Sequence, residues 1–310
     1  MTSVLNRTTT RPAVVDEVTD VADGVVALVL RPADGEPFAP WRPGAHIDVT
    51  LPSGQVRQYS LCSDPEDVDT QRIAVRLEPG GRGGSRELHE VAVPGLVLRV
   101  GAPRNAFALA DAARHHLIAA GIGITPILAM AKSLDAAGVA ARLTYLGRTR
   151  ECMPFLDELM ALRTVEVTVV ETSVSGRPDL TALVGDETVH ACGPQSLLDE
   201  LAGLLPSERL HVERFAATAA AGDGFVVELG RTGGSVEVGA DISILDALRD
   251  RGLDLSSSCE QGICGTCETR VLGGEVDHRD DILTDSERAC GQTMMICVSR
   301  CLGTRLVLDL

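Results

Sequence analysis

Residues 259–267 read Cys-Glu-Gln-Gly-Ile-Cys-Gly-Thr-Cys, and a further cysteine, Cys297, follows within Met-Met-Ile-Cys-Val-Ser-Arg. The spacing C-x-x-x-x-C-x-x-C allows three thiolates, Cys259, Cys264 and Cys267, to wrap one side of a compact iron–sulfur cluster while a fourth arrives from a distant strand. Zinc is the competing metal, but structural zinc sites usually pair C-x-x-C with a second close pair, and here Cys297 stands alone. The spacing predicts a 2Fe–2S cluster with these four ligands.

Length and composition indicate a globular protein with more than one core. The chain has 310 residues, of which 45% are apolar and 23% charged, and domains typically hold about 100–200 residues. Its 28 basic and 44 acidic side chains give a formal charge of −16. This charge argues against a nucleic-acid partner, because a polyanion is bound by clustered Lys and Arg.

Cysteine usage and the start of the chain bear on the compartment. The nine cysteines are an odd number, which favours ligation or redox chemistry over a disulfide framework. The first residues lack the apolar core of a secretory signal, and no stretch is long and apolar enough for a membrane span. We therefore expect a cytoplasmic protein that does not cross a membrane.

Hydrophobic patterns divide the chain into three domains and a linker. Residues 1–106 hold short β-rich segments between turn signals, which is typical of an antiparallel β-barrel. Residues 107–215 alternate strands with helices, which predicts an α/β domain with a parallel sheet. The small residues of 216–224 suit a linker. Residues 225–310 carry the cysteine motif and predict an α+β ferredoxin domain of the plant type, a β-grasp fold.

The second of these domains has the clearest local signals. Strands are expected at 115–120 and 141–147, and helices at 126–138 and 154–162. The glycine that would end the first of these helices is Gly138.

A glycine-rich turn follows the strand at 115–120. Gly121, Gly123, Thr125 and Pro126 stand between this strand and the next helix, where glycines permit a tight turn and the helix start attracts a pyrophosphate. A packing turn in any α/β protein could read the same way.

A later strand of the same domain ends in Cys192-Gly193-Pro194. Ligands of open α/β sheets gather at the carboxyl ends of the strands, so this segment should face the same crevice as the glycine-rich turn. The alternative for Cys192 is a buried thiol at the end of a strand.

Two segments of the first domain have the chemistry to bind a flat ring with a phosphate tail. Arg57, Tyr59 and Ser60 supply a cation, an aromatic face and a hydroxyl. Gly83-Gly84-Ser85 supplies exposed backbone and a hydroxyl at the expected start of a helix. Each segment taken alone could be an ordinary strand or turn.

Together these five motifs resemble, in order, those of the phthalate dioxygenase reductase family, to which vanillate demethylase reductase subunits belong. The motifs are R-x-Y-S-L, G-R-G-G-S, G-x-G-x-T-P, C-G-P and the plant-type ferredoxin segment. The resemblance covers essentially the whole chain after its first dozen residues. It implies FMN in the first domain, NADH against the second and a 2Fe–2S cluster in the third.

The resemblance also implies roles for individual residues. Tyr59 would lie against the flavin ring, and Ser60 would hydrogen-bond near the flavin nitrogen that accepts the hydride. Arg57 and the segment 83–85 would hold the FMN phosphate. The dinucleotide-binding residues would be Gly121, Gly123, Thr125, Pro126, Gly193 and Pro194, with Cys192 near the nicotinamide. The residues expected at the centre of the reaction are thus Tyr59, Ser60 and Cys192.

One local departure concerns the choice of nucleotide. An acidic residue that binds the adenosine ribose is expected after the strand at 141–147, but the chain continues Gly147-Arg148-Thr149-Arg150. Arg148 and Arg150 could favour the 2′-phosphate of NADPH, whereas the family resemblance favours NADH.

The resemblance implies an electron-transfer reductase that is a monomer when free. Its partner would be a terminal oxygenase, either a Rieske non-haem iron enzyme that hydroxylates or demethylates an aromatic compound, or a haem-thiolate monooxygenase. An alternative of another class is a non-catalytic metal-binding or redox-sensing protein that retains the fold.

Overall fold

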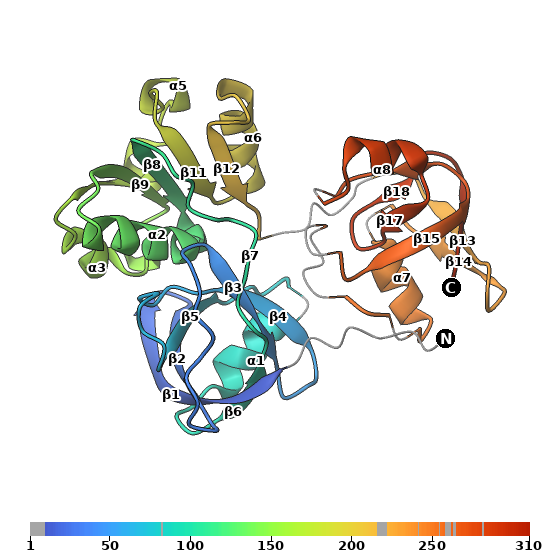
Figure 1. Ribbon diagram of the computed structural model, residues 1–310, viewed down its shortest axis with the longest axis horizontal. Helices are drawn as coiled ribbons and strands as arrows, with labels where there is room; N and C mark the ends of the chain where they lie inside the picture. The colour runs from blue at the N-terminus through green and yellow to red at the C-terminus, as the bar shows by residue number, and fades with distance from the viewer. Residues whose placement is uncertain are drawn as a thin grey trace. The chain divides into compact units, whose positions relative to one another are not determined.

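The computed structural model describes residues 10–81, 83–215, 222–240, 242–253, 255–257, 262, 265–280 and 282–310. The chain divides into two compact units, Met1–Arg214 and Phe215–Leu310, and each is described by itself. The first unit contains two separate sheets (Figure 1), and the sequence of the second unit includes the cysteine motif.

The first sheet is antiparallel and curls into a barrel (Figure 1). Its strand order is β4-β3-β6-β1-β2-β5, with β7 paired to β3. The strands are β1 (Arg11–Ala22), β2 (Val25–Pro32), β3 (Ala45–Thr50), β4 (Val56–Ser60), β5 (Gln71–Arg76), β6 (Val97–Val100) and β7 (Arg104–Asn105). Helix α1 (Gly84–Val91) lies between β5 and β6 in the chain. Alternating apolar residues of the strands fill the interior, as the sequence predicts.

The second sheet is entirely parallel, with strand order β10-β9-β8-β11-β12. Its strands are β8 (His115–Ala120), β9 (Ala141–Gly147), β10 (Val165–Glu171), β11 (Thr188–Cys192) and β12 (Leu210–Glu213). The chain runs from β8 outward to β10 and then returns to β11 beside β8. The strand order thus reverses between β8 and β11, and open α/β sheets bind ligands at the carboxyl ends of the strands at such a reversal.

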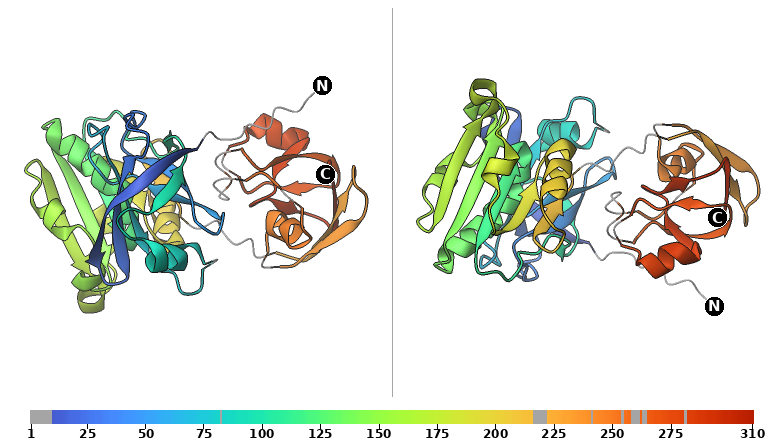
Figure 2. Two further views of the ribbon diagram at one scale, coloured as in Figure 1. Left: turned by 90° about the horizontal axis from the view of Figure 1, so that it is seen from below. Right: turned by 90° about the horizontal axis from the view of Figure 1, so that it is seen from above.

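Helices cover both faces of the parallel sheet (Figure 2). They are α2 (Ile124–Ala136), α3 (Leu156–Met160), α4 (Thr172–Ser175), α5 (Leu180–Leu183) and α6 (Gln195–Leu204), with short 3-10 turns η1 (Gly121–Gly123) and η2 (Arg150–Cys152). Helices α5 and α6 pack on one face, while α2 and α3 pack on the other.

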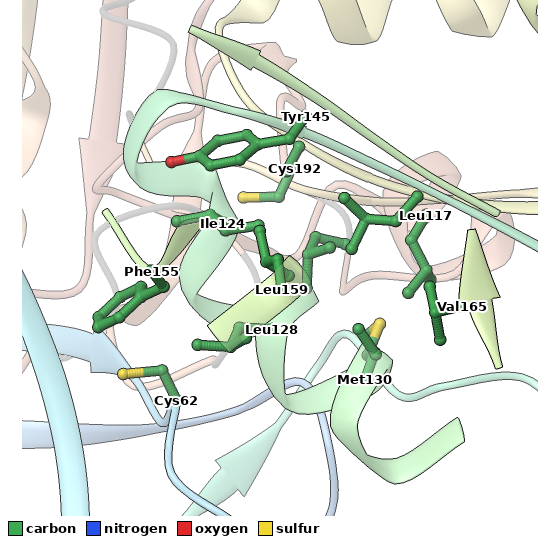
Figure 3. Close-up of a cluster of buried hydrophobic side chains, with 14 of the residues drawn as sticks. Cys62, Leu117, Ile124, Leu128, Met130, Tyr145, Phe155, Leu159, Val165 and Cys192 are labelled. Carbon is green, nitrogen blue, oxygen red and sulfur yellow. The ribbon is translucent and has the colours of Figure 1, made fainter. Parts of the chain in front are cut away.

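One hydrophobic cluster joins the two sheets of the first unit. Helix α2 contributes Ile124 and Leu128, the barrel contributes Cys62, and α3 and its N-cap contribute Leu159 and Phe155 (Figure 3). Nine of the thirteen residues of α2 are buried, because the helix lies between the parallel sheet and the barrel. The barrel and the parallel sheet are therefore fixed against each other by a shared core.

A charged network crosses the same junction. The Arg72 guanidinium of β5 contacts the Glu158 carboxylate of α3 through both terminal nitrogens, at 2.8 and 2.9 Å. The Lys132 ammonium of α2 lies 2.5 Å from Glu158. Arg72 also stacks 4.6 Å above the centre of the Phe155 ring. A bidentate pair of this kind stabilises the contact and also fixes the relative orientation of the two side chains.

The helix expected over 154–162 is shorter in the structure and spans Leu156–Met160. Phe155, its N-cap, adopts a left-handed backbone conformation with φ of 66°, which costs a non-glycine residue about 1–2 kcal/mol. Burial of its ring in the shared cluster offsets this cost. The strands expected at 115–120 and 141–147 are observed with these bounds, and the helix expected at 126–138 begins at Ile124.

The second unit is a mixed sheet with strand order β14-β13-β19-β15-β17 and a small β16-β18 pair. The strands are β13 (Phe225–Leu229), β14 (Ser235–Val238), β15 (Glu268–Gly273), β16 (Val276–Asp277), β17 (Thr293–Met295), β18 (Arg300–Cys301) and β19 (Arg305–Leu308). Strands β13 and β19 are parallel and the other pairs are antiparallel. Helix α7 (Ile244–Asp250) packs its buried face on this sheet, and α8 (Asp285–Cys290) precedes β17.

The multi-domain fold class expected from the sequence is confirmed, with an antiparallel barrel, a parallel α/β sheet and an α+β ferredoxin-type unit. Part of the expected linker, residues 216–221, lies outside the described residues. Within the described part of the chain, no helix combines the length and hydropathy needed to cross a bilayer.

Truncation of Leu128 to Ala should test the shared core. Leu128 is fully buried between the two sheets, so Leu128→Ala should lower the free energy of unfolding of the first unit by about 2–5 kcal/mol. Leu204→Ala, at an exposed position of α6, should cost under about 1 kcal/mol. Urea unfolding followed by circular dichroism measures both. Equal losses in the two variants would contradict a core shared through α2.

Candidate functional site

The glycine-rich turn and the Cys192-Gly193 segment meet at the carboxyl ends of β8 and β11. A Cβ atom built on Gly123 would lie 2.3 Å from the carbonyl oxygen of Cys192, and one on Gly193 would lie 2.9 Å from the Cβ of Ala120. Such separations are shorter than van der Waals contact, so only glycine permits this approach of the two turns. The structure thus brings two distant segments of the sequence to one edge of the sheet.

The helix start beyond this turn is buried. Thr125 and Pro126 occupy the first turn of α2. The Thr125 hydroxyl donates to the carbonyl of Ile122 at 3.0 Å, which ties the helix start to the glycine-rich turn. In this arrangement Thr125 supports the shape of the turn.

Cys192 is a fully buried thiol at the end of β11. Burial, together with the nearby Glu213 carboxyl, raises the pKa of Cys192 well above its ordinary value. The thiol is therefore protonated at neutral pH. It offers a small, uncharged surface and a weak hydrogen-bond donor rather than a thiolate nucleophile.

Glu213 is a site residue that the sequence analysis missed. It ends β12 directly beside Cys192, its register partner on β11. Burial raises the pKa of Glu213 to about 8, although a hydrogen bond with the Ser60 side chain opposes that shift. Within the described part of the chain, its Oε2 atom has no hydrogen-bond partner, and a buried polar atom of this kind requires one.

Three groups from separate elements therefore converge: the Ser60 hydroxyl of β4, the Cys192 thiol of β11 and the Glu213 carboxyl of β12. The sequence analysis predicted Ser60 and Cys192 as site residues, each from a different motif. Glu213 follows no recognisable motif, and only the pairing of β12 with β11 brings it to the site.

Tyr59 and Ser60 are successive residues of β4, so their side chains point to opposite faces of the strand. Ser60 is buried and meets Glu213, whereas half-buried Tyr59 packs against the barrel core. Burial raises the pKa of Tyr59 to about 12, so the phenol is neutral. The carboxylate of Glu87 acts in the same direction and Arg57 opposes it.

Arg57 lies against the N-terminus of α1. A Cβ atom on Gly84 would fall 2.7 Å from the Nε atom of Arg57, so the missing side chain makes room for the guanidinium. Arg57 also donates to the carbonyl of Val56 at 2.9 Å and to the Gln55 side chain at 2.5 Å. A cation is thereby held next to the first backbone N–H groups of a helix, which is a favourable place for a phosphate.

The other two residues of this turn, Gly83 and Ser85, set its backbone conformation and its position. Gly83 has φ of 89°, a conformation that L side chains rarely adopt. The Ser85 hydroxyl accepts a hydrogen bond from the Glu78 backbone N–H at 3.0 Å, which anchors the turn to the chain that leaves β5.

Two of the four predicted cluster ligands are described in the second unit. The sulfur atoms of Cys267 and Cys297 are buried and lie 3.1 Å apart, although 30 residues separate them in the chain. Cys259 and Cys264 lie outside the described residues. Convergence of two buried thiols from distant segments fits a metal centre bound by thiolates.

Glycines shape the loop around these ligands. Gly262 and Gly265 have φ of 76° and 74°. A Cβ atom on Gly262 would lie 2.6 Å from the Val298 side chain and 2.9 Å from the Cα of Asp280. The loop backbone thus passes close to the residue that follows Cys297, where only glycine fits.

A family model described as "2Fe-2S iron-sulfur cluster binding domain" matches residues 227–302. This range includes all four predicted ligand cysteines. The model matches the second unit alone.

Similarity to characterised proteins extends over almost the whole chain. The phenoxybenzoate dioxygenase subunit beta of Ectopseudomonas oleovorans is 43% identical over 93% of this chain and 94% of its own length. A solved structure of phthalate dioxygenase reductase, described as modular for electron transfer from pyridine nucleotides to [2Fe-2S], is 37% identical with a TM-score of 0.75, covering 97% of this chain and 98% of that one.

A second similar solved structure is an intact type IV self-sufficient cytochrome P450 monooxygenase, 42% identical with a TM-score of 0.74. The alignment covers 97% of this chain but only 41% of that one, so the chain spans less than half the length of that relative. Full-length matches at these identities establish the family: the chain belongs to the phthalate dioxygenase reductase family of oxygenase reductases.

Proposed function

We propose that this protein is an NADH-dependent reductase that supplies electrons to a Rieske-type oxygenase or demethylase acting on an aromatic compound. The observation that carries this proposal is the convergence of Ser60, Cys192 and Glu213 at the switch point of the parallel sheet, in a chain that also holds a 2Fe–2S binding domain. When bound, FMN supplies the conversion of a two-electron hydride donor into single electrons, which the 2Fe–2S cluster carries onward.

The barrel provides the residues for FMN. Arg57 and the Gly83-Gly84-Ser85 turn would hold the phosphate at the N-terminus of α1, where the cation and the helix start already lie together. Tyr59 would lie along the ring and Ser60 would donate to a ring nitrogen. We assign residues 1–106 to this FMN-binding domain.

The parallel sheet provides the residues for NADH. Gly121, Gly123 and Thr125 would shape the turn for the pyrophosphate, with Pro126 at the start of α2 and Gly193 and Pro194 on the facing turn. Cys192 would lie beside the nicotinamide. We assign residues 107–215 to this nucleotide-binding domain, 216–224 to a linker and 225–310 to the ferredoxin domain.

The protein's own groups prepare a neutral, water-poor site for the hydride step. Cys192 is protonated and fully buried, and Glu213 retains its proton up to about pH 8. Neither group therefore places a negative charge beside an incoming nicotinamide at neutral pH. The Ser60–Glu213 hydrogen bond and the pairing of Cys192 with Glu213 bring the ends of β4, β11 and β12 together at this site.

In the second unit, Cys259, Cys264, Cys267 and Cys297 would ligate the cluster. The buried sulfur atoms of Cys267 and Cys297 already face each other. Gly262 and Gly265 would allow backbone N–H groups to approach the cluster sulfurs, and such hydrogen bonds help to set the potential.

The second candidate partner is a haem-thiolate monooxygenase. The similar self-sufficient cytochrome P450 favours this alternative, since a homologous segment there lies in one chain with a monooxygenase. The full-length relatives named as dioxygenase subunits or reductases favour the Rieske type. We propose that the free protein is a cytoplasmic monomer.

The visible spectrum tests the proposed chemistry. The purified protein should show flavin bands with iron–sulfur shoulders, and anaerobic NADH should bleach both. Cys297→Ser should lose the iron–sulfur shoulders and bound iron but keep a flavin that NADH bleaches, because the ligands and the flavin residues lie in separate units.

Cys301→Ser provides the matched control, since Cys301 lies four residues from Cys297 but outside the ligand set. It should keep both chromophores. A colourless wild-type protein, or loss of flavin in Cys297→Ser, would contradict the proposal.

Cys192→Ala should slow flavin reduction by NADH under single-turnover conditions. A cavity beside the nicotinamide would loosen the alignment that hydride transfer needs, with an expected loss of about 10-fold or more. Flavin content should be unchanged. Cys62→Ala, which truncates another fully buried thiol of the same hydrophobic cluster, should leave the rate within about twofold of wild type. If both variants behave alike, Cys192 is only a packing residue.

Glu213→Gln should change the pH dependence of stability. Burial raises the pKa of Glu213 from its ordinary value of 4.5 to about 8 in the folded protein. Between these values the native state holds a proton that the unfolded state has released. Wild-type stability should therefore fall as the pH rises from about 4.5 to about 8, by at most about 1.4 kcal/mol per pH unit from this group.

Urea unfolding between pH 5 and pH 8.5 measures this effect. The stability of Glu213→Gln relative to wild type should increase as the pH rises. Glu208→Gln, at an exposed position just before β12, should run parallel to wild type. A parallel curve for Glu213→Gln as well would show that Glu213 ionises normally.

A further inference from the structure

A buried carboxylate of the second unit lies against the segments that carry the predicted cluster ligands. Asp280 is 2% exposed and follows the short strand β16, which pairs with β18. Its backbone lies beside Gly262, which stands between Cys259 and Cys264 in the sequence: a Cβ atom on this glycine would fall 2.9 Å from the Cα of Asp280. Asp280 is not among the site residues predicted from the sequence.

The side chain of Asp280 also reaches the segment beyond the fourth ligand. The Ser299 hydroxyl, two residues after Cys297, donates to the Oδ1 atom of Asp280 at 3.3 Å. The same hydroxyl accepts a hydrogen bond from the Arg279 backbone N–H at 3.2 Å. The Leu283 N–H donates to the other carboxylate oxygen, Oδ2, at 2.9 Å. Hydrogen bonds to both oxygens therefore fix the carboxylate in a residue that contacts both ligand-bearing segments.

A guanidinium partly balances the charge of this carboxylate. Arg288 of α8 lies 4.0 Å from Oδ2 of Asp280, and it also donates to the Asp280 carbonyl. The His278 imidazole lies 3.5 Å from Oδ1. The Asp280 side chain has no exposed surface, whereas that of Arg288 is 34% exposed. A buried carboxylate is stable only when it is hydrogen-bonded and paired, and these contacts meet that requirement.

Fixed charges near an iron–sulfur cluster change its reduction potential. Reduction adds a negative charge to a group that four thiolates already make anionic, so a carboxylate nearby disfavours the added electron and a cation favours it. Because Asp280 is buried, water and salt screen its charge only weakly. Asp280 and Arg288 should therefore change the potential in opposite directions.

We infer that Asp280 sets the reduction potential of the 2Fe–2S centre: its buried carboxylate lowers the potential, and Arg288 moderates this effect. Asp280 is a positioning and charge-bearing residue and not a ligand. A lower potential makes the centre a stronger one-electron donor to the acceptor protein. This inference rests on the proposed function and names the pair of residues that adjusts its last electron step.

Asp280→Asn tests the inference in the full-length holoenzyme. The amide keeps the size of the side chain and an acceptor for the Leu283 N–H, but it removes the charge. The cluster is titrated against a redox dye of known potential and followed by the electron paramagnetic resonance signal of its reduced form. The equilibrium constant for adding one electron should rise about threefold or more. All variants are titrated at one pH, because the charge of His278 depends on pH.

Arg288→Gln should change the same equilibrium constant in the opposite direction. Removal of the guanidinium leaves the Asp280 charge less balanced, so the constant should fall by about twofold or more. The effect is smaller than that of Asp280→Asn because Arg288 is partly exposed to solvent. An unchanged or increased constant in Arg288→Gln would overturn the inference, even if Asp280→Asn binds no iron.

The matched control is Glu275→Gln, which removes a negative charge at an exposed position just before β16. Its equilibrium constant should stay within about 1.5-fold of wild type, because water screens an exposed charge. An unchanged constant in Asp280→Asn would overturn the inference. An equal rise in Asp280→Asn and Glu275→Gln would also overturn it, since the total charge of the unit would then explain both.

The dye titration requires neither NADH nor an oxygenase, so it separates this inference from the proposed function. If NADH does not reduce the wild-type protein but the two opposite shifts are observed, the proposed function fails and the role of Asp280 stands. If NADH reduces the wild type and the shifts are absent, the role of Asp280 fails alone. A wild-type protein that binds no 2Fe–2S cluster would overturn both.

Discussion

Packing of α2 between two sheets is the constraint on which the geometry of the first unit depends. Apolar residues of this helix contact the parallel sheet on one side and the barrel on the other (Figure 3). A helix buried on both sides cannot shift relative to either sheet without opening voids, and interiors packed at crystal-like density resist such voids. The Arg72–Glu158–Lys132 network adds directional contacts at the same junction. At the end of β4, the Ser60 side chain hydrogen-bonds with Glu213 of β12, which lies beside Cys192 of β11.

This constraint explains the unusual ionisation at the site. Removal of water from the space between β4, β11 and β12 raises the pKa of both Cys192 and Glu213, because a low-dielectric environment disfavours their charged forms. Both groups are therefore protonated at neutral pH. At the edge formed by β9 and β10, charges remain exposed to solvent and are instead balanced in pairs. The same sheet thus has buried, uncharged groups at the ends of β11 and β12 and partly exposed, paired charges at the ends of β9 and β10.

The second unit brings together cysteines from one short segment and from one distant strand. Its cysteine motif is local in sequence except for Cys297, and the buried approach of Cys297 to Cys267 follows from the pairing of β15 with β17. Arg300 illustrates how tightly the adjoining segment is held: its buried guanidinium donates to the carbonyls of Ile242, Asp223 and Gly239.

Features that depend on local spacing could be predicted from the amino-acid sequence alone. The C-x-x-x-x-C-x-x-C motif identified the cluster domain, since ligand spacing is a property of one short loop. Strand and helix periodicity identified the antiparallel and parallel sheets, because a strand's pattern reflects which of its faces are buried. Glycine turns were recognisable from composition, although their close contact with Cys192 was not.

Contacts that depend on strand order and on packing between sheets could not be predicted from the sequence and follow from the folded arrangement. Glu213 reaches Cys192 because β12 pairs with β11, and it reaches Ser60 because α2 joins the barrel to the parallel sheet. Glu171 reaches the end of β9 because β10 lies parallel to it in register. No spacing in the sequence encodes these neighbours, since each pair joins separate strands whose adjacency is set by the burial of whole helices and sheets.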